Sequence, residues 1–152
     1  MDRTSMLLMA DFRDRYLSQM KGATILDVGS RGVRNYRRLF EPTFKYVGMD
    51  IIPGPNVDIV GFGNIDLAFD VVISGQVMEH VKRPWEWLKH LTSYFTKYIC
   101  IIAPHTWKEH KYPLDTYRYL TDGMRDLFEY AGIKELEIKM DRRLTVGIGE
   151  KA

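Results

Sequence analysis

Short apolar runs of strand length, separated by polar turns, constrain the fold of this chain more than any other feature of its sequence. The most uniform of them is Tyr-Ile-Cys-Ile-Ile-Ala at residues 98–103, which ends at Pro104. A strand with apolar side chains on both faces is typical of the interior of a parallel sheet. Similar runs occur at residues 24–28, 46–50, 57–60 and 69–74, whereas residues 136–140 and 144–148 alternate and predict an antiparallel hairpin.

Segments with helical spacing lie between these runs. Apolar residues recur every four positions from Leu8 to Met20, with Ser5 as the predicted N-cap and Gly22 as the stop. The other predicted helices cover residues 33–40, 84–95 and 122–131, the last with Thr121 as its N-cap.

The order of these elements indicates the fold class. Buried strands that alternate with helices and end in a hairpin predict an α/β fold, a three-layer α/β/α sandwich whose mostly parallel sheet closes with a C-terminal antiparallel hairpin. The 152 residues suffice for one domain, with an N-terminal helix in residues 1–21 and a core over residues 22–152.

Composition and charge exclude several classes of protein. With 45% hydrophobic and 28% charged residues, the chain is neither disordered nor collagenous nor a coiled coil. The single cysteine, Cys100, excludes an internal disulfide and a multi-cysteine zinc site. No apolar run approaches the ~20 residues of a membrane span. The apolar segment at residues 6–10 is too short for a signal peptide. We therefore expect a soluble, cytoplasmic protein.

Two connections are too short to hold a helix. Residues 51–56 and 61–68 fall below the ~10 to 12 residues that a helical crossover needs. The helices expected there are therefore predicted to be missing. Their loss would leave apolar sheet surface that a second copy of the chain or a partner protein could cover.

The first apolar run ends in a glycine-rich turn, Asp-Val-Gly-Ser-Arg-Gly at residues 27–32, that leads into a predicted helix. Glycines let a ligand approach the backbone closely, and a helix N-terminus offers free N–H groups. Asp50 ends the next run, where an acid accepts hydrogen bonds from ribose hydroxyls in doubly wound folds. Together these features favour a nucleoside ligand over a solvated Asp50 that only caps the turn at Pro53.

These residues resemble the class I S-adenosylmethionine-dependent methyltransferases. The resemblance is carried by residues 25–32, 46–50 and, most specifically, 69–81, where Phe-Asp-Val-Val-Ile-Ser is followed by a short turn and Glu-His-Val. Residues 103–124, with Tyr-Pro, Asp and Tyr-Arg before the last helix, are similar to one branch of the family. The resemblance covers residues 22–135 and implies a Rossmann-like fold, S-adenosyl-L-methionine as the cofactor, and methyl transfer.

The resemblance also implies cofactor contacts, position by position. Asp50 would hold the ribose hydroxyls, and Ile51 would pack on the adenine. Phe62 and Asn64 stand where the family usually has an acid that reaches the adenine amine. Arg31 replaces the usual second glycine of the first motif, and its side chain either narrows the pocket or turns outward. The residues implied at the methionine end and under the sulfonium are Asp27, Gly29, Ser30, Gly32, Gly75 and Gln76.

Residues 104–120 form a polar, aromatic segment without periodicity, about the length at which a loop is usually functional. In a methyltransferase this loop would face the methyl group, and its composition favours a small polar or glycan-like acceptor, methylated at oxygen or nitrogen. A hydroxyl acceptor needs a base. His105 and His110 are the first candidates, His80 is the third, and Asp115 is a base or an orienting group. Alternatively, the loop only covers the end of the sheet.

Other functions compete with this interpretation. The arginines near residues 31–38 lack interleaved aromatics, so a solvated face is favoured over a nucleic-acid patch. The four histidines show no metal-type pair, and no metal site is predicted. A nicotinamide-dependent oxidoreductase would share the turn, but its Tyr-x-x-x-Lys constellation is lacking. The main alternative is a degenerate, non-catalytic subunit that binds the cofactor and acts through a partner. The sequence does not decide between a monomer and a homo-oligomer.

Overall fold

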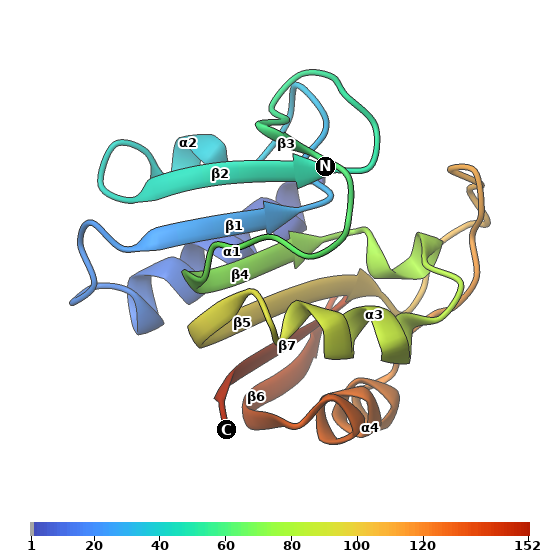
Figure 1. Ribbon diagram of the computed structural model, residues 1–152. Helices are drawn as coiled ribbons and strands as arrows, with labels where there is room; N and C mark the ends of the chain where they lie inside the picture. Colours follow the sequence, from blue (N-terminus) through green and yellow to red (C-terminus); the bar gives the residue numbers. More distant parts are fainter. Residues whose placement is uncertain (1) are drawn as a thin grey trace.

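The apolar runs assemble into one seven-stranded sheet, seen in a computed structural model that describes residues 2–152 (Figure 1). The strands are β1 (Thr24–Val28), β2 (Lys45–Asp50), β3 (Ile59–Val60), β4 (Phe69–Gly75), β5 (Phe95–Pro104), β6 (Ile133–Asp141) and β7 (Leu144–Lys151). Their spatial order is β3-β2-β1-β4-β5-β7-β6. All neighbours pair in parallel except β7, which runs antiparallel to β5 and β6.

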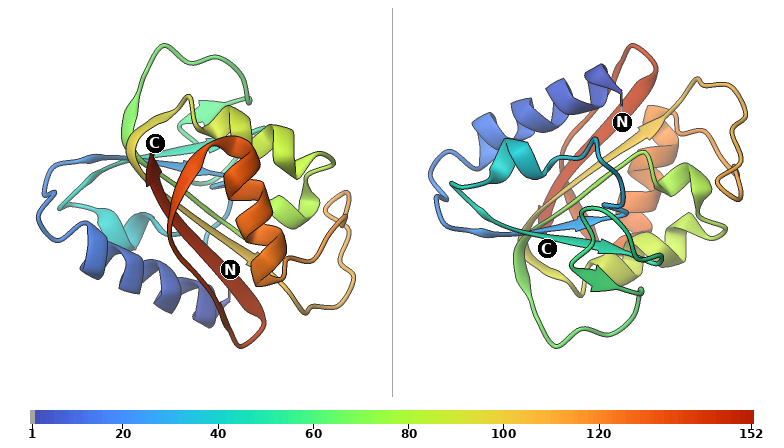
Figure 2. Two further views of the ribbon diagram at one scale, coloured as in Figure 1. Left: turned by 90° about the horizontal axis from the view of Figure 1, so that it is seen from below. Right: turned by 90° about the horizontal axis from the view of Figure 1, so that it is seen from above.

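Helices cover both faces of the sheet, which confirms the three-layer architecture (Figure 2). They are α1 (Arg3–Tyr16), α2 (Arg37–Phe40), α3 (Pro84–Leu91), α4 (Thr121–Ala131) and the short 3-10 helix η1 (Met78–His80). Helices α1 and α2 pack on one face, and α3 and α4 pack on the other. Within residues 2–152, no helix is long and apolar enough to cross a membrane.

Strand β5 is buried on both of its faces. Ile99 and Ile101 join the core beneath α3 and α4, whereas Cys100 and Ile102 join the core beneath α1 and α2. All four side chains are fully buried, and they alternate between the faces because successive residues of a strand point in opposite directions. The prediction of an interior strand at residues 98–103 is therefore confirmed.

The predicted N-caps of α1 and α4 are wrong. Asp2 caps α1, since its carboxylate accepts a hydrogen bond from the Thr4 N–H at 2.6 Å. Ser5 lies inside the helix, buried, with its hydroxyl bonded to that of Tyr36. Thr121 is the first residue of α4 rather than its N-cap. A serine that satisfies a distant buried tyrosine cannot be distinguished from a cap by local sequence alone.

Three helices are shorter than predicted. Helix α1 ends before Gly22 is reached, α3 ends at Leu91, and residues 33–36 are irregular, so that only the single turn of α2 forms. Asn35 explains the last difference: its amide donates to the Gly32 carbonyl at 2.9 Å and accepts from the Arg37 N–H at 3.0 Å. Such bonds to nearby backbone compete with helix formation.

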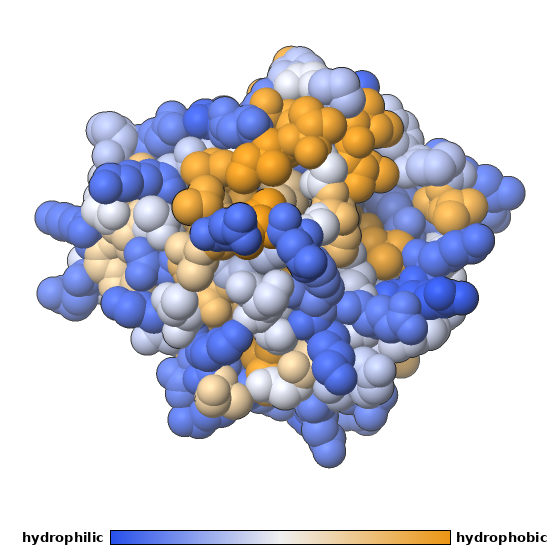
Figure 3. Space-filling model, in the orientation of Figure 1, coloured by the Kyte–Doolittle hydropathy of each residue, from blue (hydrophilic) through white to orange (hydrophobic). Residues whose placement is uncertain are grey.

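The two helices predicted to be missing are absent from the described residues. No helix forms in residues 51–58 or 61–68, and β3 is only two residues long. Residues 61–68 instead cross one face of the sheet as a loop (Figure 1). Apolar side chains gather on one part of the surface in Figure 3. In and next to these connections, Ile51, Val60 and Leu67 are exposed.

The Ser5–Tyr36 pair yields a test by a double-mutant cycle. Ser5→Ala should lower the free energy of unfolding by about 1–3 kcal/mol, because the buried Tyr36 hydroxyl loses its partner. Adding Tyr36→Phe should cost little more, since neither polar group then remains.

As the control, Asp2→Ala removes the real cap and should cost about 1 kcal/mol whether residue 36 is Tyr or Phe. Chemical denaturation of the four cycle variants measures the coupling. Equal costs of Ser5→Ala in both backgrounds would show that Ser5 does not depend on its bond to Tyr36, which would contradict this assignment.

Candidate functional site

The carboxyl ends of parallel strands β1, β2, β4 and β5 meet at one edge of the sheet. In an open α/β sheet, ligands bind in the crevice at this edge. Pairing of Asp27 with Gly48 on one side and with Ile73 on the other fixes the relative height of the strand ends. The glycine-rich turn, Asp50, the Gly75–Gln76 pair and the loop at residues 105–120 therefore leave the sheet on the same side.

The glycine-rich turn is held to β2 by its own backbone. Gly29 has a φ of +84°, and an added Cβ would lie 2.2 Å from the side chain of Val77. The N–H groups of Gly29 and Ser30 donate to the Met49 carbonyl at 2.8 and 3.1 Å, and that of Gly32 donates to Pro55 at 3.0 Å. The expectation of a helix N-terminus with free donors is therefore wrong: no helix follows directly, and these three N–H groups are used within the chain.

Asp50 is fixed at the end of β2. Its carboxylate accepts hydrogen bonds from the backbone N–H groups of Arg31 and Ile52, each at 3.1 Å. Each carboxylate oxygen has two lone pairs, so acceptor capacity remains on this partly exposed group. The side chain of Arg31 is exposed and lies against Gly54, where an added Cβ would be 2.8 Å from Nε.

Asp27 lies beneath the turn in a buried polar network. Burial raises its pKa to about 7, although a hydrogen bond from the Tyr46 hydroxyl favours the charged form. Asn56 donates to the Tyr46 oxygen at 3.0 Å and accepts from the Arg37 Nε at 2.6 Å. These contacts attach residues 51–58 to the sheet where a crossover helix is missing.

The residues implied to lie under the sulfonium are covered from two directions. The Gly75 backbone lies against the Tyr36 hydroxyl, which an added Cβ would approach to 1.8 Å. Gln76 adopts a φ of +58°, and its side-chain oxygen accepts from the Asp2 N–H at 3.3 Å. The first described residues of the chain therefore lie beside Gln76.

The residues implied at the adenine lie around β3. Phe62 packs against Trp87 and His90, with ring centroids 6.4 and 4.9 Å apart, respectively. These three aromatic residues line an open groove of about 570 Å³ on the outer side of α3. Ile51 and Asn64 are exposed on the loops that precede and follow β3.

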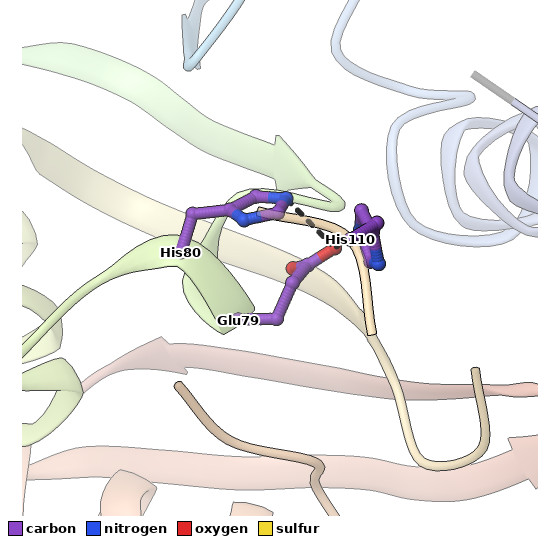
Figure 4. A group of neighbouring side chains, drawn as sticks. All are labelled: Glu79, His80 and His110. Carbon is purple, nitrogen blue, oxygen red and sulfur yellow. Dashed lines mark ion pairs between the residues drawn. The ribbon is translucent and has the colours of Figure 1, made fainter. Parts of the chain in front are cut away.

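A second group of polar side chains lies at the end of β4 (Figure 4). Glu79 and His80 come from η1, and His110 reaches them from the loop after β5. The Glu79 side chain is 1% exposed, and burial raises its pKa to about 7. Its Oε1 lies 3.7 Å from His80 Nε2 and 3.9 Å from His110 Nε2. The sequence prediction missed Glu79, because no spacing connects it to a histidine 31 positions later.

Both histidines are oriented through their Nδ1 atoms. Nδ1 of His80 lies 2.6 Å from the Leu114 carbonyl, and that of His110 lies 2.9 Å from the Lys108 carbonyl. Carbonyl oxygens only accept, so each Nδ1 carries a hydrogen, and in the neutral form of the ring the lone pair is then on Nε2. The Nε2 atoms are the ones that face Glu79.

Asp115 fixes the loop that carries His110. Its carboxylate accepts from the His110 N–H at 2.7 Å and pairs with Arg118 through two bonds of 2.6 and 2.7 Å. The Arg118 guanidinium holds the pKa of Asp115 below its usual range. This geometry suits an orienting group rather than a proton acceptor.

The structure separates His105 from the other two candidates. Its Nε2 donates to the Arg142 carbonyl at 2.6 Å, and its Nδ1 lies 3.0 Å from the Thr106 hydroxyl. His105 is thus held at the turn between β6 and β7, whereas His80 and His110 come together with 4.8 Å between ring centroids.

No protein-family model matches the sequence, and no curated protein is similar to it. Solved structures do match its fold, over almost the whole chain. The 1,6-didemethyltoxoflavin-N1-methyltransferase of Burkholderia thailandensis, with bound 1,6-didemethyltoxoflavin and S-adenosylhomocysteine, gives a TM-score of 0.79 at 13% identity. The match covers 99% of this chain and 80% of that protein.

Two further structures show the same fold. Magnesium protoporphyrin IX methyltransferase from Synechocystis PCC 6803, with bound S-adenosylhomocysteine, gives a TM-score of 0.73 at 14% identity, covering 98% of this chain and 83% of that one. A methyltransferase from Aquifex aeolicus, described as S-adenosylmethionine-dependent, gives 0.67 at 17% identity and covers 100% of both chains. Residues 2–152 therefore have the Rossmann-like fold of the class I S-adenosylmethionine-dependent methyltransferases, which confirms the predicted fold class.

Proposed function

We propose that this protein is an S-adenosylmethionine-dependent methyltransferase that acts on a small, polar acceptor. The observation that carries the proposal is the position of Asp50, which ends β2 beside the glycine-rich turn in a fold that holds S-adenosylhomocysteine in similar structures. A carboxylate with free lone pairs at this edge suits a ribose diol. The bound cofactor would supply an electrophilic methyl group.

The remaining cofactor contacts follow from the same placement. Gly29 and Gly32 would let the cofactor approach the backbone closely, but they would not donate hydrogen bonds to it, because their N–H groups are already bonded within the chain. Ser30 and Asp27 support the turn from below, and Arg31 stays outside the pocket. The methionine end and the sulfonium would lie above this turn and the Gly75–Gln76 pair. The adenine would lie near β3, among Ile51, Phe62 and Asn64.

The acceptor would bind between this site and the loop at residues 105–120. His110 and His80 lie at this loop with 38% and 17% of their side chains exposed, so either imidazole is placed to take a proton from an acceptor hydroxyl. Asp115 holds His110 in place. His105 is the weaker candidate, because both of its ring nitrogens are engaged at the hairpin turn. A polar or glycan-like acceptor, methylated at oxygen or nitrogen, fits the hydroxyl, imidazole and guanidinium groups of this loop.

Two observations favour a second candidate function. The bonded N–H groups of the turn and the apolar side chains exposed around β3 are also compatible with a cofactor-binding subunit that needs a partner for activity. Tight cofactor binding without turnover on any of a broad panel of acceptors would support this alternative.

The first test is calorimetric titration with S-adenosylmethionine and S-adenosylhomocysteine. Both should bind, and Asp50→Ala should weaken binding about 10- to 100-fold, because hydrogen bonds to a charged group are lost. The control, Asp126→Ala, changes an exposed acid on α4 and should leave the affinity unchanged. If the unaltered protein binds neither compound, the proposal is wrong.

The second test compares single histidine variants on a hydroxyl acceptor found by such a panel. His110→Ala should lower kcat about 100-fold, the usual contribution of a positioned base, whereas His105→Ala should change it much less. Single-turnover measurements separate this effect from product release. Loss of turnover in His105→Ala but not in His110→Ala would reverse the assignment.

A further inference from the structure

Glu79 is a buried carboxylate without a hydrogen-bond partner. Neither of its oxygens accepts a hydrogen bond within the described residues, although the side chain is 1% exposed. Leaving a buried polar group unsatisfied costs ~1–3 kcal/mol, and more if the group is charged. In a native protein, an ion or an ordered water can supply the missing partner of such a group.

Two imidazole nitrogens, which are potential metal ligands, lie near this carboxylate. The two Nε2 atoms lie 3.7 and 3.9 Å from Oε1, beyond hydrogen-bond distance. In the neutral form of each ring the lone pair is on Nε2, because the opposite ring nitrogen donates to a backbone carbonyl. A histidine whose second nitrogen is bonded in this way is the usual form of a metal ligand.

The spacing of the three groups fits one cation. Their ligand atoms all lie within 4.8 Å of one another. A tetrahedral ion with bonds of ~2.1 Å keeps its ligands about 3.4 Å apart. The two distances from Glu79 Oε1 to the imidazoles, 3.7 and 3.9 Å, exceed this by a few tenths of an ångström, and the two imidazoles need to move closer together. Figure 4 shows the carboxylate of Glu79 between the two imidazoles.

We propose that Glu79, His80 and His110 bind one divalent transition-metal cation of the Zn²⁺ class. Two imidazoles and one carboxylate suit Zn²⁺, Co²⁺ or Fe²⁺, whereas Mg²⁺ and Ca²⁺ prefer sets of oxygen ligands. Three protein ligands leave at least one coordination position open. His80 and His110 are 17% and 38% exposed, so that position is accessible from solvent.

The loop that carries His110 is attached to η1 independently of a cation. The Thr116 hydroxyl shares its one hydrogen between the backbone carbonyls of Glu79 and Val81, at 2.9 and 2.8 Å, and the Thr116 N–H donates to the Glu79 carbonyl at 2.7 Å. The Tyr119 hydroxyl donates to the Met78 carbonyl at 2.9 Å. The ligands are therefore brought together before any cation binds.

The cation would lie next to the proposed cofactor site. Val77, two residues before Glu79, packs against Gly29 in the glycine-rich turn. If the proposed function holds, an acceptor hydroxyl bound at the open position would lose its proton to water, because a cation lowers the pKa of a bound hydroxyl. The histidines would then act as ligands instead of bases. Binding of the cation itself does not depend on this role.

The test is a calorimetric titration of the tag-free protein with Zn²⁺, without any methyl donor. One Zn²⁺ should bind, and Mg²⁺ should bind much more weakly. Glu79→Gln and His80→Ala should each weaken Zn²⁺ binding at least ~10-fold, since each removes a ligand. The control, His90→Ala, removes a histidine bonded to Tyr94 and should leave the affinity unchanged.

Thermal unfolding provides a second readout. Zn²⁺ should raise the Tm of the unaltered protein and of His90→Ala, because it binds the folded state. It should raise that of Glu79→Gln much less at the same Zn²⁺ concentration. The neutral glutamine side chain has the same size as glutamate and is compatible with the fold. Equal affinities, or equal shifts in Tm, for the unaltered protein and Glu79→Gln would overturn the proposal. Since no cofactor is present, neither result depends on whether the protein binds S-adenosylmethionine.

Discussion

The parallel pairing of β4 with β1 and β5 is the constraint on which the rest of the structure depends. It places the ends of three buried strands at one height, so that segments far apart in the sequence leave the sheet side by side. Val77 can then pack against Gly29, and Thr116 can bond to the carbonyl of Glu79. Neither contact involves a group proposed to react, yet both determine where the side chains of the candidate site lie.

The loss of two crossover helices is compensated by polar contacts. Arg37 bonds to Asn56 at 2.6 Å and also pairs with Asp58, whose carboxylate accepts from the Gly48 N–H at 2.8 Å. These bonds attach a short loop to β2 without burying a helix face. A minimal chain can thus keep the strand end at Asp50 fixed, although it leaves apolar side chains around β3 exposed.

The parts of the fold governed by periodicity were predictable, whereas those governed by single distant contacts were not. Buried runs such as residues 98–103 identified the strands, since burial on both faces requires continuous apolar sequence. Ser5 was misassigned because its partner, Tyr36, lies outside its own helix. In the candidate site, Asp50 followed from its strand end, but Glu79 became notable only when the fold brought His110 beside it. Glu79 and His110 are 31 positions apart, and no sequence pattern relates two residues at that separation.

The hydrogen bond between Asp2 and Gln76 has a practical consequence for handling the protein. A fusion joined at the amino end would start at the carboxyl edge of the sheet, beside the segment that leads from β4 into η1. The other end of the chain leaves from the far edge, because β7 runs antiparallel to β5 and Glu150 pairs with Tyr98 near the start of β5. The two termini lie on opposite sides of the molecule in Figure 1. A tag attached after Ala152 would therefore lie away from the sheet edge that carries Asp50 and the glycine-rich turn.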